Sequence, residues 1–441
     1  MAIGYRLTAI TLRLVSILDE LNWRGLVADC TDTVELTKRL AAPTTLYCGF
    51  DPTADSLHVG NLVPLLGLRR FQLLGHHPIA VAGGATGSIG DPSGKTAERQ
   101  LLTKEILDHN IASVKVQLAK LLEFDAAKTP KNNPARLVDN ASWTVSISYL
   151  DFLRDIGKHF SVNQMIAKES VRARMEDREV GISYTEFSYM LLQAFDFMVL
   201  CRDHGCELQI GGSDQWGNIT AGIDLCRKKL GKTVYGLTLP LITNADGSKF
   251  GKTEAGAIWL DPKRTSVEDF YQFWIRTDDR DVIRYLKYFT FLSCEEIEEL
   301  EKQHNAKPES RVAHKVLAQE LRNLIHPSAT GVAERSSKIL YGTLFDDYTL
   351  EDWQFLAKHW HSVEVEKTKI IGMPLVELLV LAGLSSSKGQ ARKDIEGQGI
   401  GLNKSAGLPN FNYKIQAGDL QFEKYLRLRK GKKNYVVVTA K

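Results

Sequence analysis

Short apolar runs alternate with longer stretches of helical spacing through the first part of the chain. Residues 44–50 are rich in β-branched and aromatic side chains, which predicts a buried strand. Residues 62–74 place apolar side chains at helical spacing and stop at Gly75, which predicts a helix. The same order of strand and helix returns in three more places: 78–82, 207–210 and 234–243. This alternation from 44 to 262 predicts a parallel sheet with crossover helices.

Beyond residue 262 the apolar spacing changes. From 266 to 337 it is helical throughout, and residues 343–372 have the mixed helix and coil character of a linker. The sequence from 374 to 401 predicts a helix over 375–381, a glycine turn and a second helix over 388–396, and short strands continue to residue 438. We therefore expect a helical domain and a small α+β domain after the parallel sheet.

The loop after the first strand is suited to an anion. Asp-Pro with Ser and Gly nearby marks a tight turn, and Pro64 falls in the first helical turn, where its missing N–H costs little. A helix that begins at the end of a parallel strand offers free N–H groups and the positive end of its dipole. His58 and Asn61 add two neutral donors, and Gly60 lets a planar ligand approach the backbone. A simple helix cap is the alternative interpretation.

A second glycine-rich loop follows the strand at 78–82. Segment 83–96 is not a P-loop, because a Walker A motif needs Gly where Ile89 stands. Its glycines still allow a ligand to approach the backbone at the carboxyl end of a strand. Lys95 and Arg99 lie four residues apart on the segment that follows, so we expect two positive charges directed toward phosphates.

Two more loops carry candidate chemistry. Segment 211–218 follows a strand with glycines, Asp and Gln, as in doubly wound nucleotide-binding sheets. Segment 244–253 holds Lys249 and Lys252 among Gly and other small residues. Such a segment predicts a mobile loop that closes over a polyphosphate and opens for product release. Taken alone, it is equally compatible with a solvated turn.

One predicted helix, 181–199, carries a polar stripe on an apolar surface. Tyr189, Gln193 and Asp196 are spaced at i, i+4 and i+7, so they share one face. The residues around them are Phe and Leu, and buried polar groups are costly unless they meet a polar partner. The stripe therefore predicts a polar ligand; a hydrogen-bonded network inside the core is the alternative.

Composition places the chain among ordinary globular proteins. Of its 441 residues 44% are hydrophobic and 25% are charged, and no run of 18 apolar residues predicts a membrane span. The six cysteines lack a CxxC pair, and Cys201, His204 and Cys206 do not have the spacing of a common zinc site. We expect reduced thiols in a cytoplasmic protein. The first 16 residues resemble a transit peptide only faintly and are taken as a frayed extension.

The net charge of +3 is unevenly distributed. Residues 373–441 hold 12 Lys and Arg against 5 Asp and Glu, so this part is +7 and the remainder is −4. A basic segment attached to a slightly acidic body predicts a polyanionic partner for that segment. A solvated basic face is the alternative.

Several segments together resemble one enzyme family. His58-Val59-Gly60-Asn61 resembles the first signature of class I aminoacyl-tRNA synthetases, His-Ile-Gly-His. Lys249-Phe250-Gly251-Lys252-Thr253 resembles their second signature, Lys-Met-Ser-Lys-Ser. Blocks at 47–53, 83–90, 187–196 and 209–218 have the order and spacing of the bacterial-type tyrosyl-tRNA synthetases. The resemblance extends from about residue 16 to residue 441.

This resemblance implies a fold and a division into domains. The expected fold class is α/β: a Rossmann-like parallel-sheet catalytic domain, then a helical domain and a small α+β RNA-binding domain. The expected boundaries are 1–43 for an N-terminal extension and helices, 44–262 for the catalytic domain with a helical insertion, 263–342 for an anticodon-binding domain, 343–372 for a linker, and 373–441 for the RNA-binding domain.

The resemblance also implies an activity and its site residues. Tyrosine and ATP would give tyrosyl-adenylate and pyrophosphate, and tyrosine would then pass to the 3′ end of tRNA(Tyr). The residues implied for tyrosine binding are Tyr47, Asp91, Tyr189, Gln193, Asp196, Gln209 and Gln215. Those implied for ATP binding are Gly49, Asp51, His58, Gly60, Asn61, Gly212, Asp214 and Lys252. Those implied for catalysis are Thr53, His58, Asn61, Lys95, Arg99, Lys249, Lys252 and Thr253.

Further expectations follow from the same resemblance. Mg²⁺ would arrive with ATP, and no tightly bound protein metal is expected. The chain would form a homodimer, for which segment 150–178 is suited, without a membrane partner. Asn61 departs from the usual second His, but an Asn amide can donate a hydrogen bond from nearly the same place, so we expect activity to survive.

Three other functions are compatible with parts of the sequence. A tryptophanyl-tRNA synthetase conflicts with the pairing of Tyr47 and Asp196, and a small-cofactor adenylyltransferase conflicts with the RNA-binding segment. A synthetase-derived RNA-binding protein without catalysis, for example one that acts in intron splicing, has only Asn61 in its favour. The retained lysines of the second signature argue against it.

Overall fold

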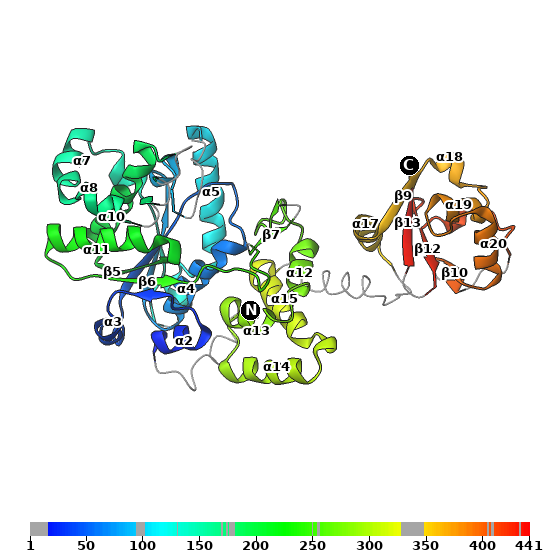
Figure 1. The fold of residues 1–441 in the computed structure, drawn as a ribbon, viewed down its shortest axis with the longest axis horizontal. Coiled ribbons are helices and arrows are strands. Elements are labelled where there is room, and N and C mark those ends of the chain that lie inside the picture. Colours follow the sequence, from blue (N-terminus) through cyan, green and yellow to red (C-terminus); the bar gives the residue numbers. More distant parts are fainter. Residues whose placement is uncertain are drawn as a thin grey trace. The chain divides into compact units, whose positions relative to one another are not determined.

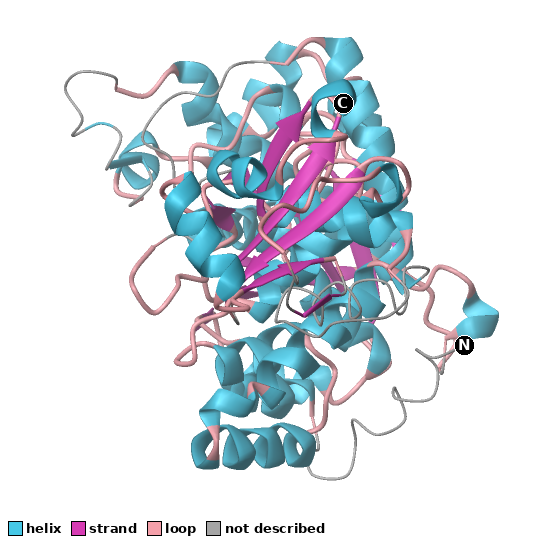
Figure 2. Ribbon diagram, turned by 90° about the vertical axis from the view of Figure 1, so that its right-hand side faces the viewer, coloured by secondary structure: helices cyan, strands magenta, loops and turns pink. Residues whose placement is uncertain are grey.

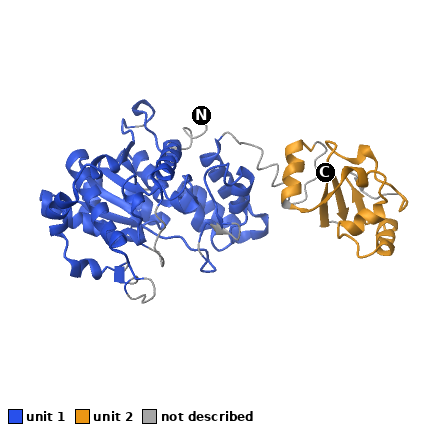
Figure 3. Cartoon of the chain, turned by 90° about the horizontal axis from the view of Figure 1, so that it is seen from above, with its two compact units in different colours: residues 1–328 blue, residues 329–441 orange. Residues whose placement is uncertain are grey.

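The computed structural model describes most of the chain. The described residues are 16–93, 102–129, 131–168, 171–172, 175, 181–248, 250–253, 256–327, 348–403, 405–406, 410–431 and 434–441. The chain divides into two units, residues 1–328 and residues 329–441 (Figure 3).

Unit 1 is built on a six-stranded sheet (Figure 1). Its strands are β1 (Asp29–Cys30), β2 (Thr45–Phe50), β3 (His77–Ala82), β4 (Arg136–Asp139), β5 (Cys206–Gly212) and β6 (Tyr235–Leu239), in the spatial order β1-β6-β5-β2-β3-β4. The five strands from β6 to β4 pair in parallel, which confirms the expected sheet. Only β1 runs antiparallel, at the edge beside β6, within a segment expected to be helical.

The register of the central strands places the site residues. Tyr47 of β2 lies between Ile79 of β3 and Gln209 of β5. The residues after each parallel strand therefore gather at one edge, the carboxyl edge of the sheet. Strand β4 was not expected, because its four residues give too short an apolar run to be recognised.

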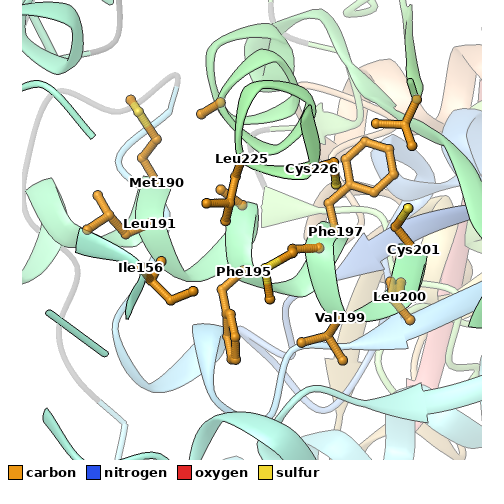
Figure 4. Close-up of a cluster of buried hydrophobic side chains, with 14 of the residues drawn as sticks. Ile156, Met190, Leu191, Phe195, Phe197, Val199, Leu200, Cys201, Leu225 and Cys226 are labelled. Atoms are coloured by element: carbon orange, nitrogen blue, oxygen red, sulfur yellow. The ribbon is translucent and has the colours of Figure 1, made fainter. Parts of the chain in front are cut away.

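Figure 2 shows strands in magenta and helices in cyan. Helices of unit 1 connect its strands. They are α2 (Ile17–Arg24), α3 (Thr33–Leu40), α4 (Leu62–Leu73), α5 (Lys104–Leu121), α6 (Ala141–Thr144), α7 (Tyr149–Asp155), α8 (Val162–Ile166), α10 (Tyr184–His204) and α11 (Trp216–Leu230). Helices α10 and α11 pack side by side. Figure 4 shows Phe195 and Phe197 of α10 in the same apolar cluster as Leu225 and Cys226 of α11.

The rest of unit 1 is helical, as expected from residue 266 onward. Its helices are α12 (Val267–Ile275), α13 (Val282–Phe289), α14 (Cys294–Ala306) and α15 (Val312–Ile325). A small hairpin, β7 (Lys252–Thr253) with β8 (Gly256–Ala257), precedes them. Phe270, Trp274 and Phe289 are fully buried, so α12 and α13 share an aromatic core.

Unit 2 is a small α+β domain with a five-stranded sheet in the order β11-β10-β12-β13-β9. Its strands are β9 (His361–Val365), β10 (Ile400–Leu402), β11 (Ser405–Ala406), β12 (Tyr425–Lys430) and β13 (Asn434–Ala440), and its helices are α17 (Leu350–His359), α18 (Lys367–Ile370), α19 (Leu375–Leu381) and α20 (Lys388–Glu396).

The structure differs from the expected linker at 343–372. Strand β9 pairs in parallel with β13 over five residues. Trp353 of α17 packs on Tyr425 of β12, with ring centroids 6.0 Å apart. The described part of this segment, from residue 348, therefore belongs to the sheet domain. The strand was not recognised because the spacing of apolar residues there fits neither a helix nor a strand, and β9 lies at the edge of the sheet.

Candidate active site

The first signature forms a closed turn at the carboxyl edge of the sheet. His58 precedes a short 3-10 helix, Val59–Asn61, that continues into α4. The Gly60 N–H donates to His58 Nδ1 at 3.0 Å, and the His58 N–H donates to Asn61 Oδ1 at 3.0 Å. Because the Asn61 oxygen is committed to this bond, its amide N–H groups are directed elsewhere. A side chain at position 60 would lie 2.8 Å from His58 Cε1, so glycine is required there.

The second signature packs directly on the first. Gly251 has a φ of +74°, and a Cβ there would lie 2.7 Å from Val59 Cγ2. The Val59 N–H donates to the Ile258 carbonyl at 3.0 Å, and the Ile258 N–H donates to the Gly251 carbonyl at 3.1 Å. Two motifs almost 200 residues apart in sequence are thus held together by backbone contacts.

Some expected phosphate ligands cannot be placed. Lys95, Arg99 and Lys249 lie outside the described residues. The backbone of Lys252 and Thr253 is described as strand β7, which continues from Gly251.

The polar stripe of α10 meets polar partners from the sheet edge. Asp196 is 4% exposed and accepts two hydrogen bonds, from Asn140 Nδ2 at 2.9 Å and from Trp143 Nε1 at 2.8 Å. Burial raises the pKa of the Asp196 carboxyl to about 7, although both hydrogen bonds act against this rise. The site therefore holds a carboxylate close to its point of ionisation.

Tyr47 and Gln209 bring polar atoms that find no partner in the described part of the chain. Tyr47 is 1% exposed, and its hydroxyl makes no hydrogen bond there; neither does Oε1 of Gln209 on the neighbouring strand. Burial raises the pKa of Tyr47 well above its ordinary value, and the negative charge of Asp196 adds to this. A buried polar group without a partner costs roughly 1–3 kcal/mol, so these two atoms are suited to bind a polar ligand.

A chain of hydrogen bonds connects Asp196 with Asp51. Asn140 Nδ2 also donates to Thr86 Oγ1 at 3.0 Å, and Thr86 Oγ1 donates to Asp51 Oδ1 at 2.8 Å. The Tyr189 hydroxyl donates to Asp51 Oδ2 at 2.9 Å. Tyr189 and Asp196 of the expected stripe are therefore both satisfied within this network, and Gln193 lies half-buried on the helix between them.

Asp91 is held by a second polar group. Gln215 Nε2 donates to Asp91 Oδ2 at 2.6 Å, and the Ser93 N–H donates to Asp91 Oδ1 at 2.9 Å. Asn218 lies in the same group and donates to Ser93 Oγ at 3.4 Å. The loops after β3 and β5 thus bring Asp91 and Gln215 together, as the strand order requires.

Gly49, Gly212 and Leu241 lie near the carboxyl ends of β2, β5 and β6. Gly49 is exposed in the middle of β2, and a Cβ there would meet nothing within 4 Å. A Cβ at Gly212 would lie 2.5 Å from Asp214 Oδ1 and 3.4 Å from Leu241 Cδ2. Leu241 is apolar and yet 58% exposed, so it offers a surface on which a flat ring could lie. Thr53 is exposed on the loop after β2.

Comparison with known proteins identifies the family. The family model described as tRNA synthetases class I (W and Y) matches residues 38–340, and the model described as a tyrosine–tRNA ligase SYY-like C-terminal domain matches residues 352–438. The chain belongs to the bacterial-type tyrosyl-tRNA synthetases of class I.

Individual relatives agree with this assignment. The tyrosine–tRNA ligase of Opitutus terrae is 58% identical over 428 residues, which covers 96% of this chain and 99% of the relative. The tyrosine–tRNA ligase 1 of Bacillus subtilis is 50% identical over 97% of this chain and 100% of its own length. Among solved structures, a C-terminally truncated mitochondrial tyrosyl-tRNA synthetase of Aspergillus nidulans matches with a TM-score of 0.67 and 33% identity, over 74% of this chain and 95% of its own.

Sequence reasoning missed four residues of this site. Asn140 and Trp143 follow β4, and the only signal for them was an Asn immediately after a short apolar run. Asn218 lies two residues into α11, inside a loop already singled out for its Gln and Asp. Leu241 gave no signal, because an isolated exposed Leu is ordinary at a protein surface.

The described residues offer neither a cluster of metal ligands nor a membrane-spanning helix. Within the described residues no group of three or more His, Cys, Asp or Glu side chains could hold a metal ion. No helix in that same part of the chain combines the length and apolar character needed to cross a lipid bilayer.

Proposed function

We propose that the chain activates L-tyrosine with ATP and transfers it to tRNA(Tyr). The observation that carries this proposal is a pair of buried polar atoms, Tyr47 Oη and Gln209 Oε1, that have no partner among the described residues, with Tyr47 close enough to Asp196 to feel its charge. A phenol hydroxyl both donates and accepts a hydrogen bond, so it suits a site with a carboxylate acceptor and a tyrosine donor. The assignment of the chain to the tyrosyl-tRNA synthetases supports the same conclusion.

In this proposal the substrate phenol lies between Tyr47 and Asp196. Asp91, Tyr189 and Gln193 surround the ammonium group, and Gln209 and Gln215 line the pocket. Phenylalanine would leave the Tyr47 hydroxyl without a partner and would give the buried Asp196 no hydrogen bond beyond those from Asn140 and Trp143, so it is rejected at the binding step. The tyrosyl-tRNA synthetases are themselves the usual illustration of this effect.

The reaction needs no protein nucleophile. A carboxylate oxygen of tyrosine attacks the α-phosphorus of ATP in line, an O–P bond forms, and the bond to the β-phosphate breaks to release pyrophosphate. The enzyme contributes positioning and charge stabilisation. His58, Asn61 and Thr53 act on the transferring phosphate or the ribose. The cations assigned to the departing pyrophosphate are Lys95, Arg99, Lys249 and Lys252, together with the hydroxyl of Thr253.

The nucleotide lies over the open side of the sheet edge. Gly49 and Gly60 leave space beside the backbone, and Gly212 with Asp51 and Asp214 surrounds the adenosine. Leu241 supplies the apolar face for the adenine ring. Mg²⁺ enters with ATP as part of the substrate, which agrees with the preference of this ion for phosphate oxygens and water over an all-protein site.

The second step requires a tRNA. We assign anticodon binding to the helical segment 263–342 and RNA binding to unit 2. The net charge of +7 over residues 373–441 and the match of residues 352–438 to a tyrosine–tRNA ligase C-terminal domain support the second assignment. The tyrosyl group then passes from the adenylate to the 3′-terminal ribose, and AMP leaves.

We further propose a homodimer in the cytoplasm. Large apolar side chains are strongly exposed on the helical insertion of unit 1: Val145, Tyr149, Leu150, Val162, Met175 and Tyr184. Such a concentration of apolar side chains marks a subunit interface more often than a free surface. All six cysteines are free thiols, which agrees with a reducing compartment.

The deciding experiment is amino-acid-dependent ATP–pyrophosphate exchange with tyrosine, phenylalanine and tryptophan in parallel. We expect exchange with tyrosine alone, followed by charging of tRNA(Tyr). Exchange with tryptophan would reassign the pocket. A folded protein that binds tyrosine and tRNA but exchanges nothing would instead be an RNA-binding protein without catalysis, with Asn61 as the first residue to revert to His.

A further inference from the structure

Helix α13 connects the two signatures through both of its ends. Its carboxyl end receives two buried arginines from the sheet part of unit 1. Arg24 of α2 donates to the Lys287 carbonyl at 2.9 Å, and Arg70 of α4 donates to the Tyr288 carbonyl at 3.0 Å. Cations at this end of a helix satisfy its free carbonyls and oppose its dipole favourably. Because α4 starts directly after Asn61, the first signature and α13 are linked by one rigid helix.

The amino end of α13 holds the stem of the second signature loop. Three side chains of this end contact three consecutive residues, 243–245, that follow β6. Asp281 Oδ2 accepts from the Ala245 N–H at 2.8 Å, and the Tyr285 hydroxyl donates to Asn244 Oδ1 at 2.9 Å. Arg284 Nη2 donates to the Thr243 carbonyl at 2.7 Å.

Asp281 is used in an unusual way. It occupies the N-cap position of α13, where an Asp normally accepts a hydrogen bond from the first turn of its own helix. Here it makes no such cap, and its carboxylate instead binds the loop N–H and the guanidinium of Arg284. Asp281 is also fully buried. The helix therefore gives up a stabilising cap, typically worth about 1 kcal/mol, while the loop gains a fixed anchor.

Phe250 fixes the loop a second time, inside the signature itself. Its side chain is 6% exposed and lies in an aromatic box made by α12 and α13. Its ring centroid lies 5.1 Å from that of Tyr285 and 5.3 Å from that of Phe289. Tyr285 thus contacts the loop twice, through its ring at Phe250 and through its hydroxyl at Asn244. In Figure 1 α12 and α13 lie together beside the sheet of unit 1.

We propose that α13 is a strut that sets the position of the second signature relative to the first, and that Asp281 and Tyr285 are positioning residues for adenylate formation. This inference rests on the proposed role of the signature lysines in binding pyrophosphate. The anchored residues, 243–245 and Phe250, lie on both sides of position 249, and Phe250 is two residues before position 252. Loosening them moves the cations without changing the tyrosine pocket, which lies on α10, β2 and β5.

The test uses full-length protein with two variants and a matched control. Tyr285→Phe removes one hydroxyl and keeps the aromatic box, and Asp281→Ala removes the loop acceptor. Tyr288→Phe is the control: Tyr288 is half-buried on the same helix, and its hydroxyl faces Gly25 rather than the loop. The readouts are the single-turnover rate of adenylate formation, the dissociation constant of tyrosine and the melting temperature.

We expect each variant to slow adenylate formation roughly 3- to 10-fold, which corresponds to the free energy of one hydrogen bond. The dissociation constant of tyrosine should be unchanged. Asp281→Asn retains an acceptor for the Ala245 N–H and should recover part of the rate lost in Asp281→Ala. The control should match the parent. Equal rates in parent and variants would overturn the proposal, as would a parallel loss of tyrosine binding and melting temperature.

A double variant separates positioning from general damage. If Tyr285 acts through the loop, Tyr285→Phe should have little further effect on a protein that already carries Lys252→Ala. Full additivity of the two changes would contradict the proposal. The proposed function fails in a different way, because the parent protein would then show no tyrosine-dependent exchange at all.

Discussion

Asn140 donates a hydrogen bond from Nδ2 to Oδ2 of Asp196 at 2.9 Å, although the two residues come from different elements 56 positions apart. Asn140 also donates to Thr86, so it orients the carboxylate and joins it to the Asp51 network. We predict that Asn140→Ala weakens tyrosine binding at least about tenfold, since hydrogen bonds to charged groups contribute about 1.5–3 kcal/mol.

Tyrosine titration followed by intrinsic fluorescence measures this effect. Ser142→Ala is the matched control, because Ser142 lies in α6 and its hydroxyl bonds only outward to the Asp139 carbonyl in this exposed turn. An unchanged dissociation constant of tyrosine in Asn140→Ala would show that Trp143 alone is sufficient to orient Asp196.

The raised pKa of Asp196 predicts a pH-dependent cost in stability. Its carboxyl titrates near pH 7 in the folded chain and near 3.8 in the unfolded chain. Between these values the folded state keeps a proton that the unfolded state has lost, so stability from this group falls as pH rises and the penalty is complete above pH 7. The full difference corresponds to at most about 4 kcal/mol.

Asp196→Asn cannot ionise, and its amide nitrogen would lose one of the two hydrogen bonds at every pH, so its melting temperature relative to that of the parent should be highest at pH 8. This relative melting temperature should fall between pH 8 and pH 4, because the parent carboxyl becomes protonated over that range. Comparing the two proteins at each pH cancels the other titrating groups. A difference that is the same at both ends of the range would place the pKa of Asp196 near its ordinary value.

The bounds of an element could be predicted from the sequence where its apolar residues had a clear period and Gly, Pro or Ser residues marked its ends. Leu375–Leu381 and Lys388–Glu396 were bounded to the residue, because a Pro, a glycine turn and serines surround them. β1, β4 and β9 were missed for a shared reason. Strands of two to five residues at or near a sheet edge bury too few side chains to show a period, and their pairing is decided by distant residues.

The site was predicted in part for a similar reason. Tyr189, Gln193 and Asp196 could be assigned to one helix face from spacing alone. The hydrogen-bond partners of Asp196 could not be predicted, because Asn140 and Trp143 reach it only after β4 joins the sheet beside β3. The contacts of Tyr285 and Asp281 could not be predicted either, because the apolar pattern of a helix does not show which loop the helix will contact.

The contact between the signatures predicts a strict requirement at Gly251. Gly251→Ala would place a Cβ 2.7 Å from Val59 Cγ2, and its φ of +74° would strain any side chain by about 1–2 kcal/mol. Gly256 is the matched control: it also has a positive φ, in the same hairpin, but a Cβ there meets nothing within 4 Å.

We therefore expect both alanine variants to lose stability through backbone strain, Gly251→Ala more so because of its clash with Val59, and only Gly251→Ala to lose most of its rate of adenylate formation. The rate should fall about tenfold or more, because the clash forces apart two motifs that must act on one phosphate. Melting curves and single-turnover kinetics measure the two effects. Equal rates in the two variants would mean that the signatures do not need this contact during the reaction.

The two-unit division predicts that activation and charging can be separated. Residues 1–328 contain every described element of the sheet edge, and residues 329–441 form a unit of their own. A relative solved without its C-terminal part covers 74% of this chain.

Removal of residues 329–441 should leave tyrosine-dependent exchange near the full-length rate and lower kcat/KM for tRNA charging at least about tenfold, through lost phosphate contacts. Since such contacts weaken as salt releases counterions, the charging KM of the full chain should rise with salt more steeply than that of the shortened protein. If exchange and charging fall together, unit 2 supports the fold of unit 1; if charging and its salt dependence are unchanged, the basic face of unit 2 has another partner.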